Sequence, residues 1–364
     1  MKQQFEKRLK KVKGELKENR LDALLVSNTS NRFWLTGYKG DAESGWVLVS
    51  KDQVYYITDS RYTEHVEKST RNTKIIEIET PLHQSWKKII TRIKVRKIGV
   101  EASSLSVGYF DKLSRESKGS IQVILTENIV EELRAVKDNS EIEKIKKACD
   151  IVDTAFKRIL DFVKPGLQEL ELAWEIEKLI RDAGAEKAAW DPFIVATGPN
   201  SSMAHWGASR SKLKKNDMVL VDFGAVYEGY YSDLSRVFFL GQPNVEQKRI
   251  YELVLEAQKR ATEQVRGGAI PAEIDKSTRS FLKKHTKHFY THSIGHGVGL
   301  EVHELPRVNP KAKNKLVAGN TITIEPGVYI PGWGGVRIED VVLVTKGGAQ
   351  FLTTSPKDIK DVTI

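Results

Sequence analysis

Two acidic residues in the middle of the chain could share a catalytic site. Asp222 and Asp233 lie in VLVDFGAVYEGYYSDLSRVFFL, where strand-like segments flank a turn near residues 227–229. A tight hairpin centred on that turn would place Asp222 opposite Asp233 on one face of a sheet. Two facing carboxylates among apolar neighbours repel each other, so they need a shared proton, basic partners or metal cations. If the register differs by one residue, each aspartate is instead an ordinary surface or turn residue.

A second pair of acids repeats this arrangement nearer the C-terminus. Glu325 ends the strand-like TITIE before Pro326, and Glu339 lies in VRIED after two glycines. A hairpin that bends near residues 332–333 would bring the two glutamates together. Strand alternation places Arg337 on the same face as Glu339. The structural alternative is an Arg337–Glu339 ion pair, with Glu325 merely closing a turn.

A histidine-rich segment supplies nitrogen donors. His292, His296 and His303 lie in THSIGHGVGLEVHELPR, and glycines flank His296. Because glycine lacks a Cβ, another backbone or a ligand can approach closely there. These glycines do not form a dinucleotide-binding fingerprint, because their spacing is wrong and no helix follows. A lone histidine is usually structural, but three histidines together with two acidic hairpins indicate a site.

The charges of these groups indicate a dinuclear metal centre. The four carboxylates carry a total charge of −4, which two divalent cations would cancel, with neutral His296 as a nitrogen ligand. Such a carboxylate-rich set suits Mn²⁺, Co²⁺ or Fe²⁺, and Zn²⁺ also fits. Two metals about 4 Å apart form a hydrolytic centre, because they lower the pKa of a shared water and polarise the attacked carbonyl.

The elements expected around these residues divide the chain into two domains. In residues 1–130, short β-rich runs alternate with helical segments at 61–69, 85–93 and 108–117, which predicts an α/β domain. In residues 131–364, helices and antiparallel hairpins predict an α+β domain. The helices expected across this boundary and beyond it are 130–163, with a capping box at 140–143, and 167–183, 245–266 and 271–285.

Composition places the chain among soluble globular proteins. Its 364 residues are 40% hydrophobic and 29% charged. No apolar run reaches the about 20 residues that span a bilayer, so we expect no membrane association. The charged N-terminus has no apolar block typical of a secretory signal. The single Cys149 excludes an intrachain disulfide and a cysteine zinc site, and together these features favour the cytoplasm.

The net charge of +10 attracts anions in general. We prefer a generally basic surface to a nucleic-acid partner, because half of the excess lies in residues 1–20. In that segment Phe5, Leu9, Val12 and Leu16 recur at helical spacing. The segment therefore predicts an amphipathic helix whose lysine-rich face is solvated.

The sequence resembles the pita-bread metallopeptidases, which include prolidase (Xaa-Pro dipeptidase), aminopeptidase P and methionine aminopeptidase. GHGVGLEVHE, TIEPGVYIPG and GGVRIEDVVLV are similar to signature stretches of that family, while SNRFWLTGYKG and YITDSRY are similar to the N-terminal domain of prolidases. The resemblance implies a C-terminal pita-bread catalytic domain and a smaller creatinase-like N-terminal α/β domain. The positions that match the family's metal ligands are Asp222, Asp233, His296, Glu325 and Glu339.

The resemblance also implies how these five residues act. Asp222 would hold one metal through both oxygens, while Asp233 and Glu339 would bridge the pair. His296 and Glu325 would complete the coordination of the other metal. Glu325 would in addition take a proton from the attacking water and pass it to the leaving nitrogen. The expected cofactor is thus a pair of divalent ions, Mn²⁺ first, with Co²⁺ or Zn²⁺ as alternatives.

Five further residues would act on the substrate or beside it. By resemblance, His303 would hydrogen-bond the substrate carbonyl as negative charge develops on it. His205, in SSMAHWG, would contact the substrate near the scissile bond, and His292 would line the pocket. Arg337, grouped with the substrate-binding residues, would orient Glu339. Arg307 would meet the substrate carboxylate, which a guanidinium binds through two contacts, unless it is a surface arginine after a turn.

The resemblance implies hydrolysis of Xaa-Pro bonds in small peptides, most directly by an Xaa-Pro dipeptidase, because Arg307 suits a free carboxylate. An aminopeptidase P that cuts longer peptides with proline second is the alternative. A peptidase-dead binding protein on the same fold is a third hypothesis, against which the intact ligand positions argue. The resemblance further implies a homodimer. Relatives often have glycine where this chain has Trp206, a difference that could narrow the substrate pocket.

Overall fold

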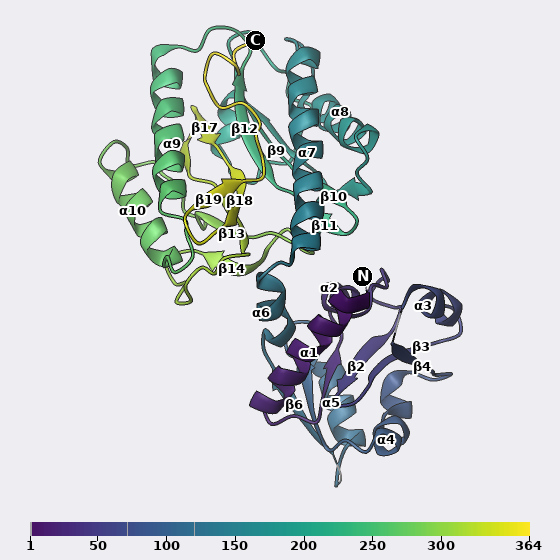
Figure 1. The fold of residues 1–364 in the computed structure, drawn as a ribbon. Helices are drawn as coiled ribbons and strands as arrows, with labels where there is room; N and C mark the ends of the chain where they lie inside the picture. Colours follow the sequence, from purple (N-terminus) through teal and green to yellow (C-terminus); the bar gives the residue numbers. More distant parts are fainter. Residues whose placement is uncertain (1, 71, 120) are drawn as a thin grey trace. The chain divides into compact units, whose positions relative to one another are not determined.

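The computed structural model describes residues 2–70, 72–119 and 121–364. The chain divides into two compact units, Met1–Arg134 and Ala135–Ile364 (Figure 1). None of the helices in the described ranges has an apolar stretch of transmembrane length. The expected fold class, an α/β N-terminal domain and an α+β C-terminal domain, is confirmed.

The first unit is built on a mixed six-stranded sheet with the order β4-β3-β2-β1-β5-β6. Its central strand β1 pairs antiparallel with β2 and parallel with β5. The strands are β1 (Ala23–Val26), β2 (Trp46–Ser50), β3 (Val54–Thr58), β4 (Thr73–Glu77), β5 (Lys97–Glu101) and β6 (Gln122–Thr126). The helices are α1 (Lys2–Glu18), α2 (Thr29–Thr36), α3 (Thr63–Ser69), α4 (Leu82–Ile93), α5 (Val107–Glu116) and α6 (Ile129–Ala135).

Helix α1 is amphipathic, as its apolar spacing predicted. Val12 and Leu16 are fully buried, whereas Lys7, Lys10 and Lys11 are exposed. Helix α2, by contrast, was not expected from the sequence. The side chain of its N-cap residue Asn28 accepts a backbone N–H, and a glycine in the left-handed region ends it, so both of its ends carry recognisable capping residues.

The second unit places its strands between two pairs of helices, α7 with α8 on one side and α9 with α10 on the other (Figure 1). The helices are α7 (Asn139–Phe162), α8 (Glu169–Asp182), the short 3₁₀ helix η1 (Gly198–Ser202), α9 (Val245–Glu263) and α10 (Pro271–Lys283). The helix expected over 130–163 is thus two helices, α6 and α7. Asp138 caps α7 in a capping box with Glu141, not Ser140 as predicted, because its carboxylate is the one that accepts the free N–H groups.

The strands of the second unit form short sheets. One has the order β12-β9-β8, another β14-β13-β15-β18-β19, and the smaller ones are β11-β10-β7 and β16-β17. The strands before α9 are β7 (Lys187–Ala188), β8 (Ile194–Thr197), β9 (Met218–Phe223), β10 (Ala225–Tyr227), β11 (Tyr230–Tyr231) and β12 (Leu234–Phe239). Those after α10 are β13 (Gly295–Gly297), β14 (Glu304–Val308), β15 (Thr321–Ile324), β16 (Gly327–Ile330), β17 (Gly334–Arg337), β18 (Asp340–Val344) and β19 (Ala349–Phe351).

The hairpin that carries the first pair of acids has a different register from the one expected. Its strands turn through Glu228 and Gly229, whose φ values of 46° and 84° match a two-residue turn with both central residues in the left-handed region. Asp222 therefore pairs with Ser235 and not with Asp233. The offset is two residues, and residues two apart in a strand point to the same face. Asp233 consequently keeps the face of Asp222.

Candidate metal centre

The second pair of acids lies at a break between two ladders. Glu325 follows β15 and Glu339 precedes β18, and the last pair of the β15–β18 ladder is Ile324 with Asp340. Beyond the break the β16–β17 hairpin continues in the same register and turns at residues 331–333. The two glutamates are therefore directly opposite each other, as the sequence predicted. Because neither belongs to a continuous ladder, both side chains can turn toward the site.

His296 joins the two acidic hairpins. Its Nε2 lies 3.5 Å from Oδ2 of Asp233 and 3.4 Å from Oε1 of Glu325. One ligand atom from each of Asp233, His296 and Glu339 lies within 4.8 Å of the others, a spacing that could hold a metal ion. The other ring nitrogen, Nδ1, lies 3.2 Å from the carbonyl oxygen of Gly297 and can donate to it. That contact turns Nε2 toward the acids, where its lone pair would bind a metal, whereas the raised pKa of His296 in the metal-free protein places a proton there.

The glycines around His296 are required by the approach of other strands. A Cβ added at Gly295 would come 1.9 Å from the carbonyl oxygen of Thr323, and one at Gly297 would come 2.2 Å from that of Leu305. No side chain fits at such distances from backbone atoms, so only glycine lets β13 lie between β14 and β15. The glycine spacing noticed in the sequence thus serves the close strand packing that carries His296.

The acids fit divalent cations because each of two carboxylates keeps one oxygen without a protein partner. Oδ1 of Asp222 and Oε1 of Glu339 are buried and accept no hydrogen bond from any described residue. Their other oxygens are held, Oδ2 of Asp222 by Arg337 at 2.5 Å and Oε2 of Glu339 by Ser235 at 2.8 Å. An unsatisfied buried carboxylate oxygen is costly, and a bound cation would satisfy it.

The acids also shift each other's pKa values. Burial and then the charges of Glu339 and Asp222 raise the pKa of Asp233 well above its ordinary value. Burial and Glu325 raise the pKa of Glu339 to about 8. Burial opposes ionisation of Glu325 too, but its hydrogen bond to His296 and that residue's charge lower its pKa to about 2. Crowded negative charge of this kind is what two cations would relieve.

Arg337 supports the acids from a position different from the expected one. Its Nη2 donates to Asp222, its Nε donates to Oγ of Ser235 at 2.7 Å, and its Nη1 donates to the hydroxyl of Tyr329 at 2.8 Å. It reaches Glu339 only through Ser235. The buried guanidinium is thus held by protein atoms and lies behind Asp222, whereas the sequence had assigned it to Glu339 and grouped it with the substrate contacts.

Comparison with known proteins identifies the family. The model of metallopeptidase family M24 matches residues 143–346, and that of the creatinase/prolidase N-terminal domain matches residues 8–136. The chain belongs to metallopeptidase family M24. It is therefore a metallopeptidase, and the family uses divalent metal ions.

This M24 metallopeptidase resembles both dipeptidases and aminopeptidases. The Xaa-Pro dipeptidase of Pyrococcus horikoshii is 36% identical over 97% of this chain and 98% of that protein. A solved Xaa-Pro dipeptidase from Bacillus anthracis has a TM-score of 0.93 and 35% identity, covering 99% of this chain and 100% of its own. The X-Pro aminopeptidase from Thermotoga maritima has a TM-score of 0.86 and 33% identity, covering 95% and 98%.

Tyr329 is a site residue of this metallopeptidase that sequence reasoning missed. Burial raises the pKa of its hydroxyl to about 12, so it stays protonated and can donate to Nε2 of His292, 3.0 Å away. Nδ1 of His292 lies 2.7 Å from the carbonyl oxygen of Ser293 and can donate to it. Strand alternation from Glu325 through residue 327 to 329 could have indicated Tyr329, because all three positions share one face.

Three of the residues expected to contact the substrate are exposed. The exposed His303 places its ring edge-on to that of His296, with centroids 4.3 Å apart, and partial desolvation together with His296 lowers the pKa of His303 to about 4. His205 is exposed after η1, close enough to influence the pKa of Asp222. Arg307 is exposed on β14.

Trp206 follows His205 and is tied to the protein at its indole nitrogen. The N–H donates to Oε2 of Glu169 at 2.9 Å, and Glu169 is fully buried at the start of α8. The same carboxylate accepts the backbone N–H groups of Thr197 and Ser209, at 2.8 and 3.0 Å. The indole therefore has a fixed position beside the segment that carries His205.

Proposed function

We propose that this M24 metallopeptidase hydrolyses the Xaa-Pro bond of dipeptides. Two divalent ions would be held by Asp222, Asp233, His296, Glu325 and Glu339. The observation that carries the proposal is the meeting of both acidic hairpins at His296, with two buried carboxylate oxygens that have no partner among the described residues. The relatives named Xaa-Pro dipeptidase, which match nearly the whole chain, support the choice of substrate.

The side chains divide the work of hydrolysis between them. Bound divalent ions would supply an activated water and polarise the scissile carbonyl. Glu325 would take the proton of the attacking water and deliver it to the leaving proline nitrogen. His303, neutral above a pKa of about 4, would donate a hydrogen bond to the carbonyl oxygen as charge develops on it. A donor in such a position contributes about 3–4 kcal/mol to catalysis.

Substrate recognition would use the exposed side of the site. The nitrogen of an Xaa-Pro bond carries no hydrogen, so the enzyme must recognise the ring and the chain ends instead. Arg307 would bind the free carboxylate of a dipeptide through two contacts. His205 and His292 would lie beside the substrate near the scissile bond. In a longer peptide the same carboxylate is replaced by an amide, which gives Arg307 no charge to bind.

Several finer features belong to the same proposal. The carboxylate-rich ligand set favours Mn²⁺, with Co²⁺ or Zn²⁺ as alternatives. We place the N-terminal domain at residues 1–130 and the catalytic domain at 131–364. We also propose a homodimer, by resemblance, and a cytoplasmic location without a nucleic-acid or membrane partner, from composition.

Activity of the metal-stripped enzyme tests the proposal most directly. An Xaa-Pro dipeptide and a longer peptide with proline second would be offered after Mn²⁺, Co²⁺ or Zn²⁺ is restored separately. We expect the dipeptide to be cleaved only with metal. Cleavage of the longer peptide alone would establish the aminopeptidase alternative, which the Thermotoga maritima structure favours. No cleavage of either peptide with any of the metals would overturn the proposal.

Arg307 separates the two activities further. Arg307→Met should raise KM for the dipeptide by at least tenfold, because a bidentate charged contact is worth about 1.5–3 kcal/mol. It should leave KM for the longer peptide nearly unchanged. Lys311→Met is the matched control, because Lys311 is also exposed and lies a few residues further on.

A further inference from the structure

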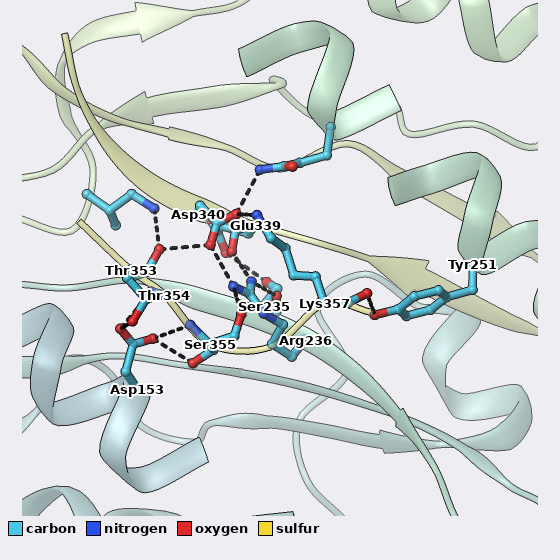
Figure 2. A network of polar contacts seen from close by, with 12 residues as sticks. Asp153, Ser235, Arg236, Tyr251, Glu339, Asp340, Thr353, Thr354, Ser355 and Lys357 are labelled. Carbon is cyan, nitrogen blue, oxygen red and sulfur yellow. Dashed lines mark hydrogen bonds and ion pairs between the residues drawn. The ribbon is translucent and has the colours of Figure 1, made fainter. Parts of the chain in front are cut away.

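A buried ion pair lies behind Glu339 and takes no part in the proposed chemistry. Nη2 of Arg236 lies 2.6 Å from Oδ1 of Asp340, and neither side chain has any exposed surface (0% for both). Arg236 is on β12, three residues after Asp233, and Asp340 begins β18 directly after Glu339. The pair thus joins the two segments that carry Asp233 and Glu339 (Figure 2).

The ion pair fixes the main chain of Glu339. Nη1 of Arg236 donates to the carbonyl oxygen of Glu339, and the backbone N–H of Glu339 donates to the carbonyl oxygen of Ser235 at 3.1 Å. The hydroxyl of Ser235 also donates to the Glu339 carboxylate. Residues 235–236 therefore hold Glu339 at its N–H, its carbonyl and its side chain. A guanidinium that turned away would release the carbonyl and leave the carboxylate less well oriented.

Asp340 keeps the Arg236 guanidinium in place, and it is itself surrounded by donors. On Oδ1 it accepts from Arg236 and from the hydroxyl of Thr353 at 2.9 Å. On Oδ2 it accepts from Nε2 of Gln258 at 2.8 Å and from Nζ of Lys357 at 2.5 Å. Each oxygen therefore accepts hydrogen bonds from two donors, and these four bonds fix the orientation of the carboxylate. Two of these donors come from the C-terminal segment 353–357.

The C-terminal segment is anchored to the helices on both sides. Asp153, on α7, accepts the backbone N–H groups of Thr354 and Ser355 at 2.7 and 2.8 Å. The hydroxyl of Tyr251, on α9, donates to the carbonyl oxygen of Lys357 at 2.9 Å. Figure 2 shows these contacts extending from Asp153 through the segment to Asp340 and Glu339. Lys357 is thereby brought to Asp340 from a part of the chain that does not reach the metal ligands itself.

We propose that Asp340 is a positioning residue for the metal centre and that Lys357 holds the Asp340 carboxylate in place. Apolar residues of similar size would join β12 to β18 at a lower desolvation cost, so stability alone does not explain a buried ion pair here. Oriented hydrogen bonds to Glu339 are what apolar residues could not supply. Partners that orient a metal ligand typically change metal affinity by about 10–100-fold when they are removed. The proposal rests on the metal site of the proposed function.

Metal affinity measured by calorimetry tests this role without depending on catalysis. Lys357→Met should weaken Mn²⁺ binding by about tenfold and Asp340→Asn by about 10–100-fold. Lys360→Met, an exposed lysine three residues after Lys357, is the matched control and should bind as the wild type does. Circular dichroism and the Tm of the metal-free proteins show whether each variant is folded. If Asp340→Asn does not fold, the Mn²⁺ affinity of Lys357→Met, compared with that of Lys360→Met, tests the proposal instead.

A double variant separates positioning from general stability. If Lys357 acts through Asp340, adding Lys357→Met to Asp340→Asn should cost no further Mn²⁺ affinity. An Mn²⁺ isotherm of Lys357→Met that superposes on the wild type, with only a lower Tm, would overturn the proposal, as would additive losses in the double variant. Wild-type protein that binds Mn²⁺ but cleaves no Xaa-Pro peptide would contradict the proposed function while leaving the positioning role testable.

Discussion

Glu325 differs from the other acids of the site because a histidine faces it. Asp233 and Glu339 are surrounded by like charges that raise their pKa values, whereas the hydrogen bond with His296 lowers that of Glu325 to about 2. Glu325 is therefore ionised in the metal-free protein, while Asp233 and Glu339 need nearby cations to lose their protons. In the metal-free protein the proton on His296 causes this difference, and cations bound to His296 and the acids would replace that proton.

Replacing Glu325 by glutamine tests its role as the proton carrier. Glu325→Gln should lower kcat by about 10²–10⁴-fold or more, because a general base contributes at least that much and a metal contact is weakened as well. The fold should persist, as judged by circular dichroism. Glu273→Gln, an exposed glutamate of α10, is the control and should retain full activity. Full activity in Glu325→Gln would exclude the proposed proton transfer.

The raised pKa values predict how the metal-free protein responds to pH. Glu339 has a pKa of about 8 against an ordinary 4.5, so the folded protein holds a proton there that the unfolded chain releases. The folded state then loses stability as the pH rises from about 4.5 through about 8. The raised pKa of His296 acts in the same direction, because its proton is also bound more tightly in the folded state.

Thermal unfolding in the presence of a chelator measures this dependence. Tm should fall between about pH 6.5 and pH 8.5, where the lowered pKa of His303 no longer opposes the change, and Glu339→Gln should flatten the profile because the glutamine binds no proton. A Tm that climbs steadily across the same range would contradict the assignment.

At the scale of elements, the segment that carries His303 is held by a buried ion pair. Nζ of Lys137 lies 2.7 Å from Oε1 of Glu304, and the two side chains are 1% and 4% exposed. The other carboxylate oxygen of Glu304 accepts the backbone N–H of Leu300 at 3.1 Å. Glu304 starts β14 immediately after His303, so its contacts limit the positions that His303 can take.

Removing Lys137 should therefore lower the free energy of unfolding. Lys137→Met removes one partner of a buried ion pair, which typically costs about 3–5 kcal/mol of unfolding free energy. Urea unfolding measures the loss. Lys178→Met removes an exposed ion pair with Glu175 and should cost no more than about 1 kcal/mol. Equal stability of the two variants would show that the buried pair is not needed.

Over the whole molecule, the proposed metal centre joins segments that are far apart in the chain. Its acids come from β9 and the segment before β12, and from the two ends of the β16–β17 hairpin, while its histidine comes from β13. Cations held by all of these segments bind the folded state only. By mass action such a ligand stabilises the fold by about 2.7 kcal/mol at a concentration of 100 times Kd.

Metal addition should therefore raise Tm in a concentration-dependent way. We expect the increase with Mn²⁺ to be lost in Asp233→Asn, since that variant lacks an acid within reach of His296. Calcium at the same concentration is a control for ionic strength and for non-specific binding. An unchanged Tm at saturating Mn²⁺ would mean that the acids do not form a metal site.

Local sequence patterns were sufficient for most elements, and the exceptions have local causes. The helices α8, α9 and α10 begin at or within two residues of the expected starts at 167, 245 and 271. Helix α2 was missed because its eight residues are too few for a clear apolar period. The strands β13 and β14 were missed because glycine and proline, which usually interrupt strands, serve close packing and strand ends there.

Which residue types form the candidate site could be read from the sequence, because the two acidic hairpins and the glycine-flanked histidine are each formed by residues close together in the chain. The folded molecule was needed to show the register that pairs Asp222 with Ser235, the contact of Arg337 with Asp222, and the contact of Lys357 with Asp340. The register depends on how one turn closes, and the contact of Arg337 joins residues more than a hundred positions apart. Lys357 reaches Asp340 only because α7 and α9 anchor the C-terminal segment. Such contacts arise from packing between elements, which no local spacing of residues encodes.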